Sequence, residues 1–339
     1  MSRRLIDLPR PRGPLTEQLF VALEGPPDAR LETPGRIEAV DPIADDDLQL
    51  ALYVAYELHY TAIDGVDEGW EWSPALLSFC AALEQPFAEA VAALVAPATA
   101  DELGSVPEAL QAIVAEDPGP PLSRFLESQG SEEQMREQVV HRSAYQLKEA
   151  DPHSWAIPRL GQLPKAALLE VQFDEYGGGN AARMHSALFA KTMEGLGLDG
   201  TYGGYLDRWP GVTLATVNLV TGFGLHRSRR GALVGHLAGF EMTSSIPNRR
   251  YGNALRRLGY GPEVTHFYDE HVEADAVHEN IAAWDLAGGL AAAEPEVAAD
   301  ILFGARALLQ VEALWARHLM DSWGRGESSL QAPLVPAAV

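Results

Sequence analysis

The sequence predicts an all-α fold, built as two layers of bundled helices. Apolar residues recur with helical spacing over most of the 339 residues, and the alternating apolar and polar runs typical of strands are nearly absent. The C-terminal half is also rich in alanine, the residue with the highest intrinsic helix propensity. These three observations favour packed helices along most of the chain.

The N-terminal third divides into an arm and a helical segment. Residues 1–44 are rich in proline, glycine and charge, which predicts an irregular arm. Three aspartates at 45–47 then provide the acidic start of a helix, and a helical pattern follows over 48–59. Two more helices are predicted over about 74–96 and 100–115. The proline-rich stretch 117–121 breaks the pattern, so we place a domain boundary there.

The remaining helices are predicted over about 131–150, 164–176, 179–197, 211–224, 231–244, 247–259, 263–285 and 295–324. The predicted organisation is therefore an arm at 1–44, an N-terminal helical segment at 45–117, a helical domain at 118–328 and a flexible tail at 329–339.

Composition excludes several classes of function. The formal net charge is −23, which disfavours nucleic acid and anionic membrane surfaces as partners. A single cysteine, Cys80, excludes a disulfide framework and thiolate metal sites. We find no signal peptide and no run approaching the roughly 20 apolar residues of a membrane span, so we expect a soluble cytoplasmic protein.

The clearest chemical motif is His271, Asp275 and His278. On a helix that turns about 100° per residue, positions i, i+4 and i+7 lie within about 60° of one another. Two imidazoles and one carboxylate suit Fe(II), Zn(II) or Mn(II), and this set is associated with non-haem iron. A solvated polar face that carries two histidines by chance is the alternative, and spacing alone does not decide between them.

Glu175 and His185 flank three glycines, Gly177, Gly178 and Gly179. On an unbroken helix, side chains ten residues apart would point about 80° apart. The glycines provide a possible break that brings both side chains to one side. A plain glycine-rich turn between two helices is the alternative interpretation.

Two further carboxylates are candidates. Glu241 lies in an apolar helix, where a buried carboxylate needs a partner or a metal, although a helix-surface glutamate fits equally well. Glu149, near the end of the 131–150 helix, is a weaker candidate because glutamate is common there. We leave out His236 and His266 as more ordinary histidines. A ferritin-type pair of Glu-x-x-His motifs, a P-loop, a dinucleotide-binding fingerprint and a Gly-x-Ser-x-Gly elbow are all missing.

Together these residues resemble the haem-oxygenase-like di-iron oxidases, or iron-containing redox enzymes. The recurring pattern of that family is Glu…His on one core helix, Glu on another and His-x-x-x-Asp-x-x-His on a third. The resemblance covers about residues 120–325 and is closest to the N-oxygenating branch, which includes an N-nitrosourea synthase and a 2-aminoimidazole N-oxygenase. Members of that branch carry an additional carboxylate, and Glu149 stands at the matching interval.

The resemblance implies a haem-oxygenase-like bundle that binds two Fe ions and uses O₂ and an external electron donor. It implies seven metal ligands, of which Glu149 and Glu241 are also candidate catalytic residues: Glu149, Glu175, His185, Glu241, His271, Asp275 and His278. His271 and Asp275, with Glu149, are assigned to one iron and His185 and His278 to the other, with Glu175 and Glu241 bridging or shared.

The implied reaction is N-oxygenation of a small amine or guanidine-type metabolite to a hydroxylamine or nitro compound, in specialised metabolism such as antibiotic biosynthesis. The 45–117 segment resembles a dimer-forming segment, so we expect a homodimer and a possible redox partner. The cupin domain that follows in the synthase is not expected here. Tyr176, Met184, Phe240 and Arg249 lie near the ligands in sequence, without a pattern that assigns them to the substrate.

Two other functions stay open. Relatives of the same fold perform oxidative C–C cleavage or desaturation of amino or fatty acids, and these generally lack the additional carboxylate. A metal-free helical binding protein on the same scaffold is the alternative from another class.

Overall fold

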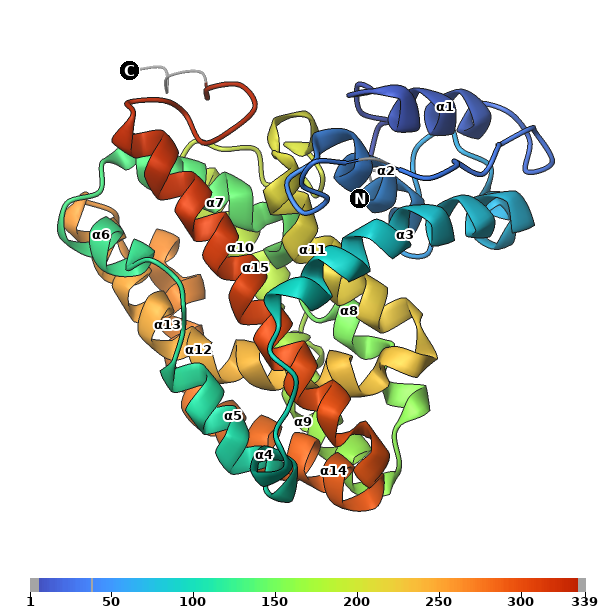
Figure 1. The fold of residues 1–339 in the computed structure, drawn as a ribbon. Coiled ribbons are helices and arrows are strands. Elements are labelled where there is room, and N and C mark those ends of the chain that lie inside the picture. Colours follow the sequence, from blue (N-terminus) through green and yellow to red (C-terminus); the bar gives the residue numbers. More distant parts are fainter. Residues whose placement is uncertain (1–5, 38, 335–339) are drawn as a thin grey trace.

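The computed structural model describes residues 6–37 and 39–334, except for the side chains of residues 273–277. Helices make up most of the described chain, and its two β-type residues, Ile6 and Ile63, form an isolated bridge (Figure 1). The all-α prediction is confirmed. The α-helices are α1 (Pro14–Leu23), α2 (Asp46–Glu57), α3 (Pro74–Leu94), α4 (Ala100–Gly104), α5 (Val106–Ala115), α6 (Leu122–Ser128), α7 (Glu132–Gln146), α8 (Asp151–Ser154), α9 (Gln162–Glu175), α10 (His185–Gly195), α11 (Gly211–Leu225), α12 (Arg230–Arg257), α13 (Pro262–Asn280), α14 (Gly289–Ala293) and α15 (Ala298–Gly324).

Two long helices, α12 and α15, form the centre of the bundle and cross at close range (Figure 1). The crossing requires glycine on both helices. A Cβ at Gly235 would overlap the backbone of Ile301, and a Cβ at Gly304 would overlap the backbone of Ala232. Helix α13 packs along α12, and α10 packs against α13, so these helices surround one interior.

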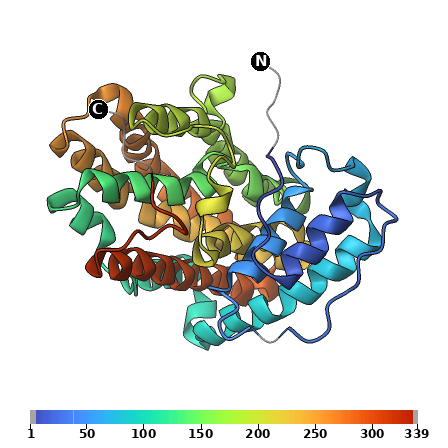
Figure 2. The same cartoon turned by 90° about the horizontal axis from the view of Figure 1, so that it is seen from above.

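The N-terminal helices α1, α2 and α3 lie together at one end of the bundle, as both ribbon views show (Figures 1 and 2). Helix α2 starts at the N-cap Asp45, whose side chain accepts hydrogen bonds from the N–H groups of Asp47 and Leu48. Its almost fully buried body packs against α11. Buried residues on both sides of residue 117 belong to one continuous core, and the proposed boundary at that residue stays a prediction.

Several element boundaries differ from the sequence predictions. Helix α1 lies inside the arm predicted to be irregular, because Pro14 starts a helix whose buried Leu19 and Leu23 face the core. The two helices predicted over 231–244 and 247–259 are one, α12. Pro247 removes one backbone donor, but buried residues on both sides of it keep the helix continuous. After α13 the chain continues as a π-helix, Ile281–Gly288.

The described part of the predicted flexible tail, residues 329–334, makes contacts with the rest of the protein. The backbone N–H of Ser329 donates to Glu137 Oε2 over 2.9 Å, and the Ser329 hydroxyl donates to the same oxygen over 2.6 Å. Leu330 and Leu334 are buried. These contacts hold Ser329 against α7, and the N–H of Gln331 donates to the carbonyl oxygen of Arg208. Residues 335–339 lie outside the described part of the chain.

Helix α3 corrects one expectation about membranes. Its 21 residues include a window of mean hydropathy 1.2, which is long and apolar enough to span a bilayer by length and composition. Five large side chains of α3, Leu76, Phe79, Leu83, Phe87 and Val91, are instead buried in the protein. The buried share of that window is 33%, and Leu77 and Leu94 are exposed.

Candidate metal centre

Six of the seven predicted ligand residues have described side chains, and the fold gathers all six in one buried region. They come from five parts of the chain. Glu149 follows α7, Glu175 ends α9, His185 starts α10, Glu241 lies in the middle of α12, and His271 and His278 lie on α13. Asp275 lies on the same helix, but its side chain is outside the described residues.

A strained turn presents Glu149. Helix α7 ends at Gln146, four residues earlier than predicted, and Ala150 adopts a left-handed conformation with φ 73°. That conformation is unfavourable for a residue with a Cβ, and such strain persists only where the surroundings hold it. Gln172 holds this turn from α9, since its Nε2 donates to the carbonyl oxygen of Ala150 over 3.0 Å. Lys148 holds it from the other side through an ion pair with Glu57 Oε2 at 2.9 Å.

The three glycines act as predicted. Gly177, Gly178 and Gly179 all have positive φ, so the chain reverses between α9 and α10. Helix α10 therefore begins at His185 rather than at the predicted residue 179. The reversal brings His185 Nδ1 to 2.9 Å from Glu175 Oε2, which confirms that the break places both side chains on one side.

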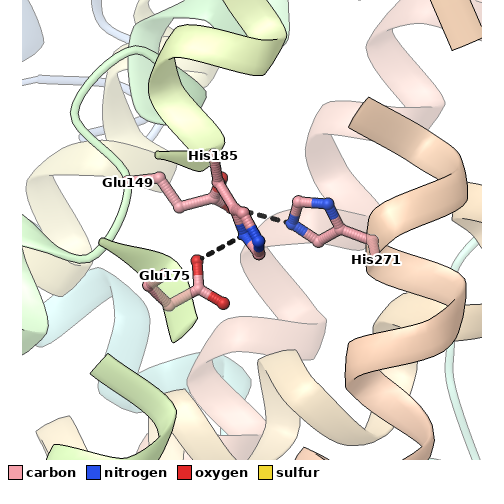
Figure 3. Close-up of side chains that lie close together, drawn as sticks. All are labelled: Glu149, Glu175, His185 and His271. Carbon is pink, nitrogen blue, oxygen red and sulfur yellow. Dashed lines mark ion pairs between the residues drawn. The ribbon is translucent and has the colours of Figure 1, made fainter. Parts of the chain in front are cut away.

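Four side chains form the first ligand group: Glu149, Glu175, His185 and His271. One candidate ligand atom from each lies within 4.8 Å of those of the other three, and all four residues are buried. The four side chains converge from separate elements (Figure 3). His185 Nδ1 lies 4.0 Å from Glu149 Oε2, and His271 Nε2 lies 3.6 Å from Glu149 Oε1. These separations leave space for an ion between the atoms.

The orientation of the His271 ring follows from one hydrogen bond. Its Nδ1–H donates to the carbonyl oxygen of Phe267, one turn earlier on α13, over 2.8 Å. Because a carbonyl oxygen only accepts, the proton lies on Nδ1 and the lone pair lies on Nε2. The Nε2 atom is the one that faces Glu149, so the ring presents a lone pair to the ligand group.

The second ligand group consists of Glu175, Glu241 and His278. His278 Nδ1 lies 3.5 Å from Glu241 Oε2, while its Nε2 lies 3.0 Å from Asp174 Oδ2. Asp174 thus accepts the Nε2–H hydrogen bond and leaves Nδ1 for an ion. Sequence reasoning missed Asp174. Its position beside Glu175 at the end of α9 was the available signal.

Burial works against the charges of this region. Loss of solvent raises the pKa values of the Glu149 and Glu241 carboxyls, although His271 and His278 counteract part of the effect. Burial would lower the pKa of His278, but contacts with Glu241 and Asp174 raise it to about 9. Several carboxylates brought together without solvent need compensating positive charge, from protons or from a cation.

The two groups share Glu175, so the geometry suits two neighbouring ions with one carboxylate between them. One detail differs from the expected assignment. His185 lies with Glu149 and His271, its ring centroid 4.2 Å from that of His271, rather than with His278. Carboxylate oxygens and imidazole nitrogens without thiolate are the donor set of Fe(II), Mn(II) or Zn(II). The residues present therefore fit a pair of such ions.

Comparison with known proteins agrees with this donor set. The family model described as iron-containing redox enzyme matches residues 136–313, more than half of the chain. All residues of the two ligand groups lie within that stretch. A search of curated proteins gives no match. The buried His and Glu cluster and the family together support an iron-binding oxidoreductase. The chain belongs to the family of iron-containing redox enzymes.

Proposed function

We propose that the protein is a non-haem di-iron, O₂-dependent N-oxygenase that acts on an amine or guanidine-type nitrogen of a small metabolite. The observation that carries this proposal is the sharing of Glu175 by two buried ligand groups. A shared carboxylate suits a pair of ions a few ångströms apart. The product is a hydroxylamine or, after repeated cycles, a nitro compound, and 2-aminoimidazole, oxidised to 2-nitroimidazole, is one candidate substrate.

The overall stoichiometry defines what the site must provide. One oxygen atom of O₂ enters an N–H bond of the substrate, and the other leaves as water. The balance requires two electrons and two protons, which an external electron donor and the solvent supply. Iron bound here would supply the redox chemistry with O₂, and the protein would supply ligands, orientation and a dry site.

The chain's own residues divide this work. Glu149, Glu175, His185 and His271 would hold one ion, and Glu175, Glu241 and His278 the other, with Asp275 as a further expected ligand of α13. The hydrogen bonds from His271 to Phe267 and from His278 to Asp174 orient the two rings. Burial of the cluster excludes bulk water from it.

Glu149 separates N-oxygenation from the reactions of other relatives of this fold. Among the enzymes that this chain resembles, those that cleave C–C bonds or desaturate their substrates generally lack this carboxylate. Glu149 points into the first ligand group here, 3.6 Å from His271 Nε2. An additional anion favours the more highly charged, oxidised ions, which supports the N-oxygenase over the C–C cleaving alternative.

Product analysis tests the proposal. Iron-loaded protein is supplied with O₂, a reductant and a panel of amines and guanidines, and products are followed by mass. We expect addition of oxygen to nitrogen, lost in Glu149→Ala and retained in Glu170→Ala, an exposed position on α9. Cleavage of a carbon–carbon bond, or full activity of Glu149→Ala, would refute the N-oxygenase assignment. Absence of iron binding would favour the metal-free binding protein.

A further inference from the structure

A cavity of about 160 Å³ adjoins the metal centre between α7, α12, α13 and α15. Its lining extends from residues 117–123, which lead into α6, to Phe240 and Phe267. Phe240 and Ser244 also line the small space around Glu149, Glu175 and Glu241. The Phe267 ring lies 4.3 Å from the His271 ring, centroid to centroid. One layer of side chains therefore separates the inner end of the cavity from the ligands.

One helix connects the cavity with the metal centre. Gln138, Arg142 and Gln146 of α7 all line the cavity, and their spacing of four residues places them on one face of the helix. Glu149 follows on the turn that ends this helix. A molecule bound along this polar face would lie in line with the first ligand group.

Three charged residues line the cavity: Asp117, which is exposed, and Arg142 and Glu312, which form an ion pair. Arg142 donates to both carboxylate oxygens of Glu312, over 2.9 and 2.6 Å, and its guanidinium lies 3.8 Å from the centre of the Trp315 ring. A two-point pair of this kind is among the strongest side-chain interactions. A charged ligand that pairs with Arg142 or Glu312 would have to displace the other partner, so this inner part of the cavity favours an uncharged occupant.

Three other polar groups in the lining have unused hydrogen-bonding capacity. The side-chain oxygens of Gln138, Gln146 and Tyr268 have no hydrogen-bond partner among the described residues. Their residues are only 1%, 8% and 2% exposed. Buried polar atoms are nearly always satisfied, so these three groups indicate a bound polar molecule. Each carboxamide can both donate and accept, and the phenol can do the same.

We propose that this cavity is the substrate site and that it selects a small, uncharged, planar molecule with an N–H donor beside an acceptor. Amino-substituted heterocycles that are uncharged at neutral pH have this edge, which complements a carboxamide. The aromatic rings of Phe189, Phe240, Phe267 and Trp315 suit a flat body. A cavity of similar size binds benzene, which limits the occupant to about that scale. The use of this site for oxidation rests on the proposed function.

Direct binding to the iron-free protein tests the site without any turnover. The probe is 2-aminothiazole, which is uncharged at neutral pH and has the required edge, and affinity is measured by calorimetry. Thiazole, without the amino group, and the charged amino acid L-arginine are the comparison ligands. We expect 2-aminothiazole to bind more tightly than either.

Variants show whether the named residues make the contacts. Gln146→Leu and Tyr268→Phe should each weaken 2-aminothiazole binding about tenfold, as expected for one lost buried hydrogen bond. Gln111→Leu, an exposed glutamine of α5, is the matched control and should leave the affinity unchanged. Thermal unfolding of each variant checks that it is folded. Because two variants at separate positions are measured, the test still works if one of them fails to fold.

A separate experiment tests the preference of the cavity for uncharged ligands. Glu312→Gln leaves Arg142 without its carboxylate, so this variant should gain affinity for the small planar anion benzoate, which the native protein should bind poorly. Tighter native binding of L-arginine than of 2-aminothiazole, or equal probe affinity in native, Gln146→Leu and Tyr268→Phe proteins, would overturn the inference. If the iron-free protein binds the probe through these residues but takes up no iron, the substrate site stands and the proposed function fails. If it takes up iron and oxidises amines but binds no probe here, the proposed function stands and the substrate site fails.

Discussion

Asp174 and His278 form a pair in which an exposed carboxylate fixes a buried imidazole. Asp174 Oδ2 lies 3.0 Å from His278 Nε2, and the side chains are 54% and 2% exposed. The other ring nitrogen is directed toward Glu241, 3.5 Å away. The pair thus determines which nitrogen of His278 is available to an ion.

Replacement of Asp174 should weaken metal binding at the second ligand group. The Asp174→Ala variant frees the His278 ring to rotate and to change its tautomer, and losses of this kind typically reduce metal affinity about 10- to 100-fold. Anaerobic Fe(II) titration measures the change. Glu170→Ala, four residues earlier on α9, is the control. Unchanged affinity in Asp174→Ala would show that the pair is a surface contact without influence on the ligand.

The ion pair between Lys148 and Glu57 should be important for stability. The two side chains are 3% and 0% exposed, and Tyr202 also donates to Glu57 Oε2 over 2.8 Å. Glu57→Gln leaves a buried ammonium without its counter-charge, so we expect a loss of about 3–5 kcal/mol in the free energy of unfolding. Urea unfolding measures it. The double variant Glu57→Gln, Lys148→Met should recover much of this loss.

The control for that pair is Arg325 with Glu327, whose side chains are 57% and 61% exposed. Its disruption should cost less than about 1 kcal/mol. A Glu57→Gln protein as stable as the native one would mean that the turn before Glu149 does not depend on this contact with α2.

A pH-dependent contact links α3 to the end of α11. His226 Nε2 lies 2.8 Å from Glu84 Oε1, and this hydrogen bond raises the pKa of His226 above 6.5. Burial alone would raise the pKa of Glu84, but the contact with His226 brings it below 4.5. The pair therefore stabilises the fold fully between about pH 4.5 and 6.5. Its contribution disappears as pH falls through the folded pKa of Glu84 or rises through that of His226.

The His226→Ala variant should accordingly melt at a lower temperature than the native protein, with the largest difference inside that window. Half of the His226 side chain is exposed, so we expect less than about 1 kcal/mol. Thermal unfolding across a pH series measures it, with exposed His266→Ala as the control. A difference in melting temperature between the two proteins that grows above pH 8 would contradict this account of the pair.

The sequence predicted much of the fold and of the site, because helical periodicity and ligand spacing are local properties. His271 and His278 share a helix, so their common face could be predicted from spacing alone. Glu175 and His185 required only the correct interpretation of three glycines. Glu149 and Glu241 could be grouped with them only through resemblance to a family, since the fold brings together segments that are distant in sequence.

Other features depend on tertiary contacts that no local pattern contains. The left-handed Ala150 shortens α7 because Gln172 and Lys148 hold the turn. Burial on both sides of Pro247 keeps α12 continuous against the local preference of proline. The Arg142–Glu312 pair joins residues 170 positions apart, so its presence in the cavity could not be foreseen.

The shared position of Glu175 provides the most direct test of a two-ion centre. Protein loaded anaerobically with Fe(II) and freed of loose metal should contain two iron ions per chain. Glu241→Ala should retain one, and Glu175→Ala should retain fewer than one, because that variant removes a ligand from both groups. A native stoichiometry of one or less at full loading, or equal iron content in Glu241→Ala and Glu175→Ala, would contradict a centre built around Glu175.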